Sequence, residues 1–330
     1  MRLPRPGRFE LVAAAFLAAT VVVAVWVSYG WKGADFGIYS RAGNVMLSSG
    51  WRHTYGPSPV QATPFELALD SLLRRAAGWS SASLQIASDL LVAALLIVGT
   101  RVFAGRKALP LALVGIAGLA LGVVADAGQT GHFAEPIAGL LWLLAAREAR
   151  NGRVERAGLL IGASAGFELW GILGVAVLAL APDLRRALRG VALAIAVPAL
   201  LLAPFVLGGD FHMFAFQWHV TGGMIRYLFP HLDAFTWPLR LLQGGVTVAA
   251  AGGLARVIRR SPASIFVVPA VAAIVRLALD PLSTFYYWDV PLVIELIGMA
   301  TAIANLDAIR RWIAVRLGGI GGDAPVAGLP

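Results

Sequence analysis

The stretch LVAAAFLAATVVVAVWVSYGWKGADFGIYSRAG, residues 11–43, joins a long apolar run to a short polar segment that contains Asp35. About twenty apolar residues are enough to cross the core of a bilayer as an α-helix. A basic flank precedes the run, as in a signal peptide, but the run is too long for an h-region and ends in bulky aromatic residues. We therefore expect a retained membrane span with a carboxylate at its end.

The composition of the whole chain also indicates a membrane protein. Of the 330 residues 58% are hydrophobic and only 14% are charged, which is too little polar surface for soluble domains of this size. The chain has no cysteine, so disulfides, thiolate chemistry and cysteine-based metal sites are excluded. The composition predicts an all-α, polytopic integral membrane protein.

The basic residues are grouped, and 19 of the 27 fall in six clusters between apolar runs. Basic loops are retained in the cytoplasm. This rule places the clusters and both termini inside the cell membrane, and it explains the net charge of +9 without nucleic acid. The clusters are Arg2/Arg5/Arg8, Arg101/Arg106/Lys107, Arg147/Arg150/Arg153/Arg156, Arg185/Arg186/Arg189, Arg256/Arg259/Arg260 and Arg310/Arg311/Arg316.

With these clusters inside, the chain reads as a single bundle of about ten transmembrane helices, residues 1–317, followed by a disordered cytoplasmic tail, residues 318–330. Segment 157–183, AGLLIGASAGFELWGILGVAVLALAPD, has basic clusters on both sides and must leave and return, although it is too short for two full spans. We expect a pair of short or broken helices with Glu168 and Trp170 at the turn. The other spans are expected at 9–29, 82–101, 108–126, 132–147, 190–207, 236–256, 262–279 and 287–307.

The outer side would then hold two large loops, at about 30–80 and 208–235, and a short one, DPLSTFYYWD, at 280–289. In the first loop, PFELALDSLLRRAAGW (residues 64–79) predicts an amphipathic helix in the outer membrane interface. Its apolar residues are Phe65, Leu69, Leu72 and Leu73, set against Glu66, Asp70, Arg74 and Arg75.

Polar residues gather on this outer side, and none of the five histidines falls in a cytoplasmic loop. Because ionisable groups resist burial in lipid, we expect one outward-facing polar cavity; ordinary solvated loop residues are the alternative. The candidate substrate-binding residues are Tyr39, Arg41, His53, Gln61, Gln129, His132, Glu135, Glu168, Trp170, His219, Arg226, Arg276, Tyr286 and Tyr287.

Several familiar sites are absent from the sequence. It has no phosphate-binding loop, no dinucleotide-binding glycine motif and no HExxH, so neither a nucleotide cofactor nor a metal is expected. A carboxylate near basic and aromatic groups suits transfer from a lipid-linked phosphate, because Asp35 can deprotonate a hydroxyl while Arg or His neutralises the departing phosphate. The alternative for Asp35 is a structural acid that pairs with Lys32 or Arg41, or caps the next helix.

Segment 35–55, DFGIYSRAGNVMLSSGWRHTY, resembles the first loop of polyprenol-phosphate-sugar-dependent membrane glycosyltransferases of the C-type fold (GT-C), in particular glycosyltransferase family 87, which includes mannosyltransferases. QATPFELALDSLL, from Gln61, resembles that family's Tyr-Pro-Pro segment, with only Pro64 retained. The region from AGQTGHFAEP at 127 to 180 is similar to its Gly-Gln motif, inward span, basic turn and broken helix, and DPLSTFYYWDVPL resembles its late outer segment.

The resemblance implies a C-type bundle in which Asp35 is the general base. The donor would be a polyprenyl-phosphate sugar, with mannose as the sugar, and transfer to a hydroxyl acceptor on a lipid or envelope glycan would be inverting. One position departs from the pattern, because many relatives have a lysine where this chain has Glu168. If that lysine holds the donor phosphate, Arg226, Arg276 or a histidine must replace it.

Two other functions fit the same sequence features. A transporter or lipid flippase would use the same cavity without making bonds. A catalytically lapsed relative would act as a partner for another envelope protein. The intact Asp35 favours the enzyme, since a flippase has no need of a lone base at that position.

Overall fold

The computed structural model describes residues 6–28, 34–56, 60–78, 80–282, 284–308 and 310. The expected tail at 318–330 and the basic residues Arg2, Arg5, Lys32, Arg311 and Arg316 lie outside the described residues.

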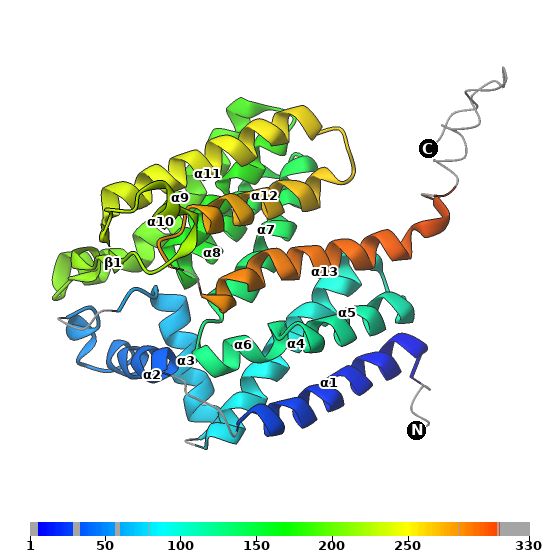
Figure 1. Cartoon of the computed structure of the whole chain (residues 1–330), viewed down its shortest axis with the longest axis horizontal. Helices are drawn as coiled ribbons and strands as arrows, with labels where there is room; N and C mark the ends of the chain where they lie inside the picture. The colour runs from blue at the N-terminus through cyan, green and yellow to red at the C-terminus, as the bar shows by residue number, and fades with distance from the viewer. Residues whose placement is uncertain are drawn as a thin grey trace.

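The described chain is a bundle of apolar helices with one short antiparallel pair of strands (Figure 1). Each expected span contains a helix. The elements are α1 (Arg8–Val27), α2 (Ala34–Met46), η2 (Trp51–His53), α3 (Pro64–Ala77), α4 (Ser81–Ala104), α5 (Ala108–Ala120), α6 (Val123–Thr130), α7 (Ala134–Arg150), α8 (Val154–Phe167), η3 (Leu169–Leu180), α9 (Leu184–Gly208), η4 (Met213–Ala215), β1 (Trp218–His219), α10 (Gly223–Leu228), β2 (Ala234–Phe235), α11 (Trp237–Ile258), α12 (Ser264–Ala278), η5 (Phe285–Trp288) and α13 (Asp289–Ala304).

The helices differ in their capacity to cross a membrane alone. Among the described residues five helices are long and apolar enough, namely α1, α4, α9, α11 and the continuous run Phe285–Ala304. The pair α5 and α6, bent by 45°, raises this number to six. The other apolar helices are shorter, such as η3 and α12. The chain is therefore an all-α polytopic membrane protein in which short and broken helices complete the bundle.

Segment 157–183 forms the expected pair of short arms. α8 ends where Glu168 adopts an extended backbone, and η3 returns against α8 so closely that a Cβ on Gly171 would lie 2.5 Å from the backbone of Ser164. The arms have 14 and 12 residues. At about 1.5 Å per residue for an α-helix and 2.0 Å for a 3₁₀-helix, each arm is roughly 20–25 Å long, short of a hydrocarbon core of about 30 Å. The predicted break at Glu168 is confirmed.

Contacts between distant basic residues and helix ends identify one end of the bundle. Arg106 pairs with Glu10, and Lys107 donates to the carbonyl of Ala304. Arg256 donates to the carbonyls of Ala179 and Ala181 after η3, where unpaired carbonyls favour a cation. Figure 1 shows the start of α1 and the end of α13 at this end, and α2, α3, α10 and β1 at the opposite end.

The helix predicted at 64–79 is present as α3, but the expected division of its faces is wrong for the two acids. Glu66 and Asp70, expected on the polar face, are buried, whereas Leu72 on the apolar face is 55% exposed. The acids point inward because the helix packs on α2, α4 and α8, and Glu66 accepts two backbone N–H bonds at the start of α7. Arg75 is exposed as well. The exposed face of α3 therefore carries both polar and apolar side chains.

The first outer loop is tied to the broken helix. Ala62 forms an isolated β-bridge with Glu168, and the backbone N–H of Thr63 donates to the carbonyl of Phe167 at 3.1 Å. The hydroxyl of Thr63 also donates to the carbonyl of Ala165. These bonds satisfy the open end of α8 and fix the position of Glu168 relative to the first loop.

Candidate active site

Asp35 lies in the first turn of α2, and its carboxylate contacts a buried histidine. Its Oδ2 is 3.0 Å from Nε2 of His132, and the Asp35 side chain is 44% exposed against 6% for His132. The imidazole stacks on Tyr286 with a centroid distance of 4.0 Å and meets Tyr39 edge-on. The expected structural pairing with Arg41 does not occur among the described ion pairs, and the partner of Asp35 is a ring held by two aromatic side chains.

Gly131 brings His132 to this position. It ends α6 with a φ of 83°, in the left-handed region that glycine adopts without a Cβ penalty. A Cβ on Gly131 would lie 2.5 Å from the backbone of Phe36. Only glycine therefore allows the end of α6 to approach α2 so closely, and the next residue, His132, reaches the carboxylate of Asp35.

Glu66 fixes the backbone on the other side of His132. Its Oε1 accepts the N–H of Phe133 at 2.7 Å and that of Ala134 at 3.3 Å. These amides begin α7, where the positive end of the helix dipole favours an anion. Burial and the neighbouring Asp70 raise the pKa of Glu66, and the two N–H bonds oppose this shift. Glu66 thus links α3 to the segment that carries His132.

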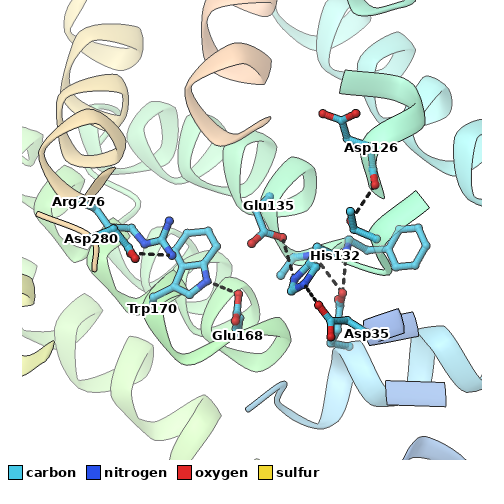
Figure 2. Close-up of polar contacts among 12 residues, drawn as sticks. Asp35, Asp126, His132, Glu135, Glu168, Trp170, Arg276 and Asp280 are labelled. Carbon is cyan, nitrogen blue, oxygen red and sulfur yellow. Dashed lines mark hydrogen bonds and ion pairs between the residues drawn. The ribbon is translucent and has the colours of Figure 1, made fainter. Parts of the chain in front are cut away.

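Glu135 lies behind the imidazole, in the first turn of α7. Its Oε2 is 3.9 Å from Nδ1 of His132, and its side chain is fully buried. Neither oxygen of Glu135 has a hydrogen-bond partner. His132 consequently has one carboxylate at each ring nitrogen, as Figure 2 shows.

A cavity of about 810 Å³ opens beside these groups, between η3, α9 and α11. Most of its lining is apolar, for example Ile195, Pro198 and Leu241. Apolar walls with a few polar groups are typical of sites for organic ligands, and here they suit a lipid chain. The polar lining residues are Gln61, Glu168, Arg240, Gln243, Arg276 and Tyr287.

Two arginines provide the positive charge of the cavity. Oδ2 of Asp280 accepts a hydrogen bond from Arg240 at 2.9 Å and lies 3.6 Å from Nη2 of Arg276. The Arg276 guanidinium lies over the rings of Trp170 and Tyr287, at 4.2 and 4.4 Å from their centroids. Its Nε and Nη1 are buried without a hydrogen-bond partner. Buried donors are normally satisfied, so Arg276 is suited to an anionic ligand.

Glu168 lies between the two groups of side chains. Trp170 donates its indole N–H to the Glu168 carboxylate. Figure 2 shows Glu135 and Glu168 between the Arg276–Trp170 pair on one side and the Asp35–His132 pair on the other. The site therefore has an acidic half around His132 and an arginine half around Asp280.

The structure brings together ten of the fifteen residues singled out from the sequence. Asp35, Tyr39, Glu135 and Tyr286 surround His132. The others, Gln61, Glu168, Trp170, Arg276 and Tyr287, line the cavity.

Five sequence candidates lie elsewhere. Arg41 and His219 are exposed, and His53 is exposed and pairs with Asp210 at 2.7 Å. Arg226 donates to the carbonyl of Val220 and is also exposed. Gln129 is half-buried on α6 and does not line the cavity.

Sequence reasoning missed Arg240 and Gln243 at the start of α11, and the inward role of Glu66. Arg240 donates to Gln243 as well as to Asp280 and lies over the ring of Trp218. A signal for Arg240 was present, because an arginine near the end of an apolar span indicates a functional site. Within the described ranges, no group of three or more His, Asp or Glu side chains is arranged to hold a metal ion.

The bundle defines a polytopic all-α membrane protein of the C-type fold. The structure of ArnT from Cupriavidus metallidurans bound to undecaprenyl phosphate has this fold, with a TM-score of 0.56 and 20% sequence identity over 92% of the present chain and 62% of ArnT. The chain thus spans about three-fifths of the length of ArnT. No protein-family model matches the sequence, and no curated protein matches it.

Proposed function

We propose that the chain is a membrane glycosyltransferase that moves a sugar from a polyprenyl-phosphate donor to a hydroxyl acceptor at the extracytoplasmic face. The observation that carries this proposal is the placement of a half-exposed carboxylate, Asp35, at the same end of the bundle as a lipid-sized cavity with unpaired arginine donors. The undecaprenyl phosphate in the ArnT structure is a lipid of the proposed donor class. The resemblance to family 87 supports mannose as the sugar.

The arginine half of the site would hold the donor phosphate. Arg276 offers two buried donors, Nε and Nη1, and a planar guanidinium suits phosphate oxygens. Arg240 adds positive charge through the shared Asp280. The prenyl chain would extend along the apolar lining of η3, α9 and α11. In this proposal the donor is held without the lysine that many relatives have in place of Glu168.

The acidic half would act on the acceptor. Oδ2 of Asp35 contacts His132, so Oδ1 is the oxygen available to a hydroxyl. In a single displacement, the acceptor oxygen bonds to the anomeric carbon as the bond from that carbon to the phosphate breaks. The hydroxyl proton passes to Asp35, and Arg276 neutralises the charge that develops on the departing polyprenyl phosphate. A phosphate is a weak base, so its departure requires no protein acid.

The test is a transfer assay with the purified full-length protein. Radiolabelled polyprenyl-phosphate mannose and a membrane-lipid extract are incubated with the protein, and polyprenyl-phosphate donors of other sugars are run in parallel. We expect the label to move to a new lipid or glycan in a protein-dependent manner. If the label stays on every donor while the protein moves those donors between the leaflets of liposomes, the chain is a flippase. Neither transfer nor movement would indicate a partner protein.

A further inference from the structure

We infer that His132 receives the proton that Asp35 takes from the acceptor, and that Glu135 stabilises the charged imidazole; this inference rests on the proposed function. His132 is then a positioning and proton-holding residue that acts through Asp35. Glu135 acts through His132, whose Nδ1 faces its carboxylate.

The geometry gives His132 a partner at each nitrogen. Nε2 is 3.0 Å from Asp35, within hydrogen-bond range, while Nδ1 is 3.9 Å from Glu135, at ion-pair range. Stacking on Tyr286 and the edge contact with Tyr39 hold the ring in this plane. A ring needed only for packing would have no use for a fully buried carboxylate whose two oxygens lack any other partner.

The proton balance of the transfer explains why a second carrier is useful. Each turnover leaves the acceptor proton on Asp35, which must lose it before the next turnover. With the resting proton on Nδ1, facing Glu135, Nε2 is free to accept the proton from Asp35. The ring then carries a positive charge between the carboxylates of Asp35 and Glu135. These carboxylates balance the charge while bound substrates cover Asp35. The proton leaves when the products leave and Asp35 is exposed to water again.

Other charged groups around the ring are arranged so that they do not compete for this proton. Two N–H bonds from the α7 backbone hold Glu66, and the indole of Trp170 holds Glu168. Arg276 lies over the rings of Tyr287 and Trp170 and pairs with Asp280 in the other half of the site. Titratable groups on the elements around His132 include Asp35 and Tyr39 on α2, Glu66 and Asp70 on α3, Asp126 on α6, Glu135 on α7, Glu168 at the α8–η3 junction, Arg276 on α12 and Tyr286 and Tyr287 on η5.

His132→Gln separates proton transfer from positioning. A glutamine amide can occupy the place of Nε2 and keep a polar contact with Asp35, but it cannot accept a proton. In the labelled-donor assay we expect kcat to fall at least about tenfold, as for a lost proton carrier, while the donor KM changes less than about twofold. The part of the wild-type pH dependence of kcat that comes from the His132 imidazole should disappear in the variant. Glu135→Gln should also lower kcat without changing the donor KM.

His53→Gln is the matched control, because His53 forms a similar pair with Asp210 on the exposed surface. It should leave kcat and the pH profile unchanged. A His132→Gln protein with wild-type kcat and pH profile would overturn the inference, as would a loss confined to KM. If His132→Gln does not fold, a normal kcat in Glu135→Gln overturns it. Absence of transfer by the wild-type protein would instead overturn the proposed function, and this inference with it.

Discussion

Arg276→Gln tests whether the arginine half of the site binds the donor phosphate. The substitution removes the positive charge and the guanidinium donors that lack a partner in the structure, Nε and Nη1. A hydrogen bond to a charged group contributes about 1.5–3 kcal/mol. Losing one such bond to phosphate should weaken donor binding about 10- to 150-fold. The fold should persist, because Asp280 keeps its shorter bond, 2.9 Å, to Arg240.

The measurement is the donor KM in the labelled-transfer assay, together with competition by unlabelled polyprenyl phosphate. Arg226→Gln is the control, because Arg226 is an exposed arginine of the same outer side whose guanidinium bonds to a backbone carbonyl. Arg226→Gln should leave the donor KM within about twofold of wild type, the scatter expected for a surface change. Equal donor affinity in the two variants would refute the placement of the phosphate at Arg276.

Three further predictions concern the acids and the topology. Burial raises the pKa of Asp70, and burial together with Asp70 raises that of Glu66, so above about pH 4 the folded state binds more protons than the unfolded state. The unfolding temperature in detergent should therefore fall as pH rises from 5 to 8, and Asp70→Asn should flatten this dependence. An unchanged slope would count against a raised pKa of Asp70. Glu168→Gln should alter donor affinity because Glu168 lines the cavity, while Glu155→Gln in the exposed first turn of α8 should not. Unchanged donor affinity in both variants would remove Glu168 from the site. Ser49→Cys should react with an impermeant maleimide in intact cells and Glu155→Cys should not, and the reverse pattern would rule out chemistry at the outer face.

The broken helix shows what the sequence was able to predict. Basic clusters at both ends of 157–183 required the chain to leave and return, and the length allowed only short arms. Charge and length are local properties, so the break could be placed near Glu168 and Trp170, and the structure has it at Glu168. The position of Asp35 at the end of the first span followed in the same way from an apolar run and the charge after it.

The faces of α3 and the role of Arg240 could not be derived by the same reasoning. The partners of Glu66 are backbone amides 67 and 68 residues further along the chain, and no periodicity within the helix can indicate them. A pattern of apolar and charged residues shows that a helix has two faces, but not whether protein or water lies against each. Of the five histidines only His132 is buried and the other four are exposed. The prediction that all five lie on the outer side therefore did not identify which of them belongs to the site.

Asp35→Asn is the most direct test of the central claim that this carboxylate is the base of a sugar transfer. Asparagine keeps the shape and can still bond to Nε2 of His132, but it cannot accept the acceptor proton. In the labelled-donor assay, transfer should fall by about 10²–10⁴, while the variant accumulates in the membrane and binds polyprenyl phosphate like the wild type. Near-normal transfer by Asp35→Asn would contradict the account.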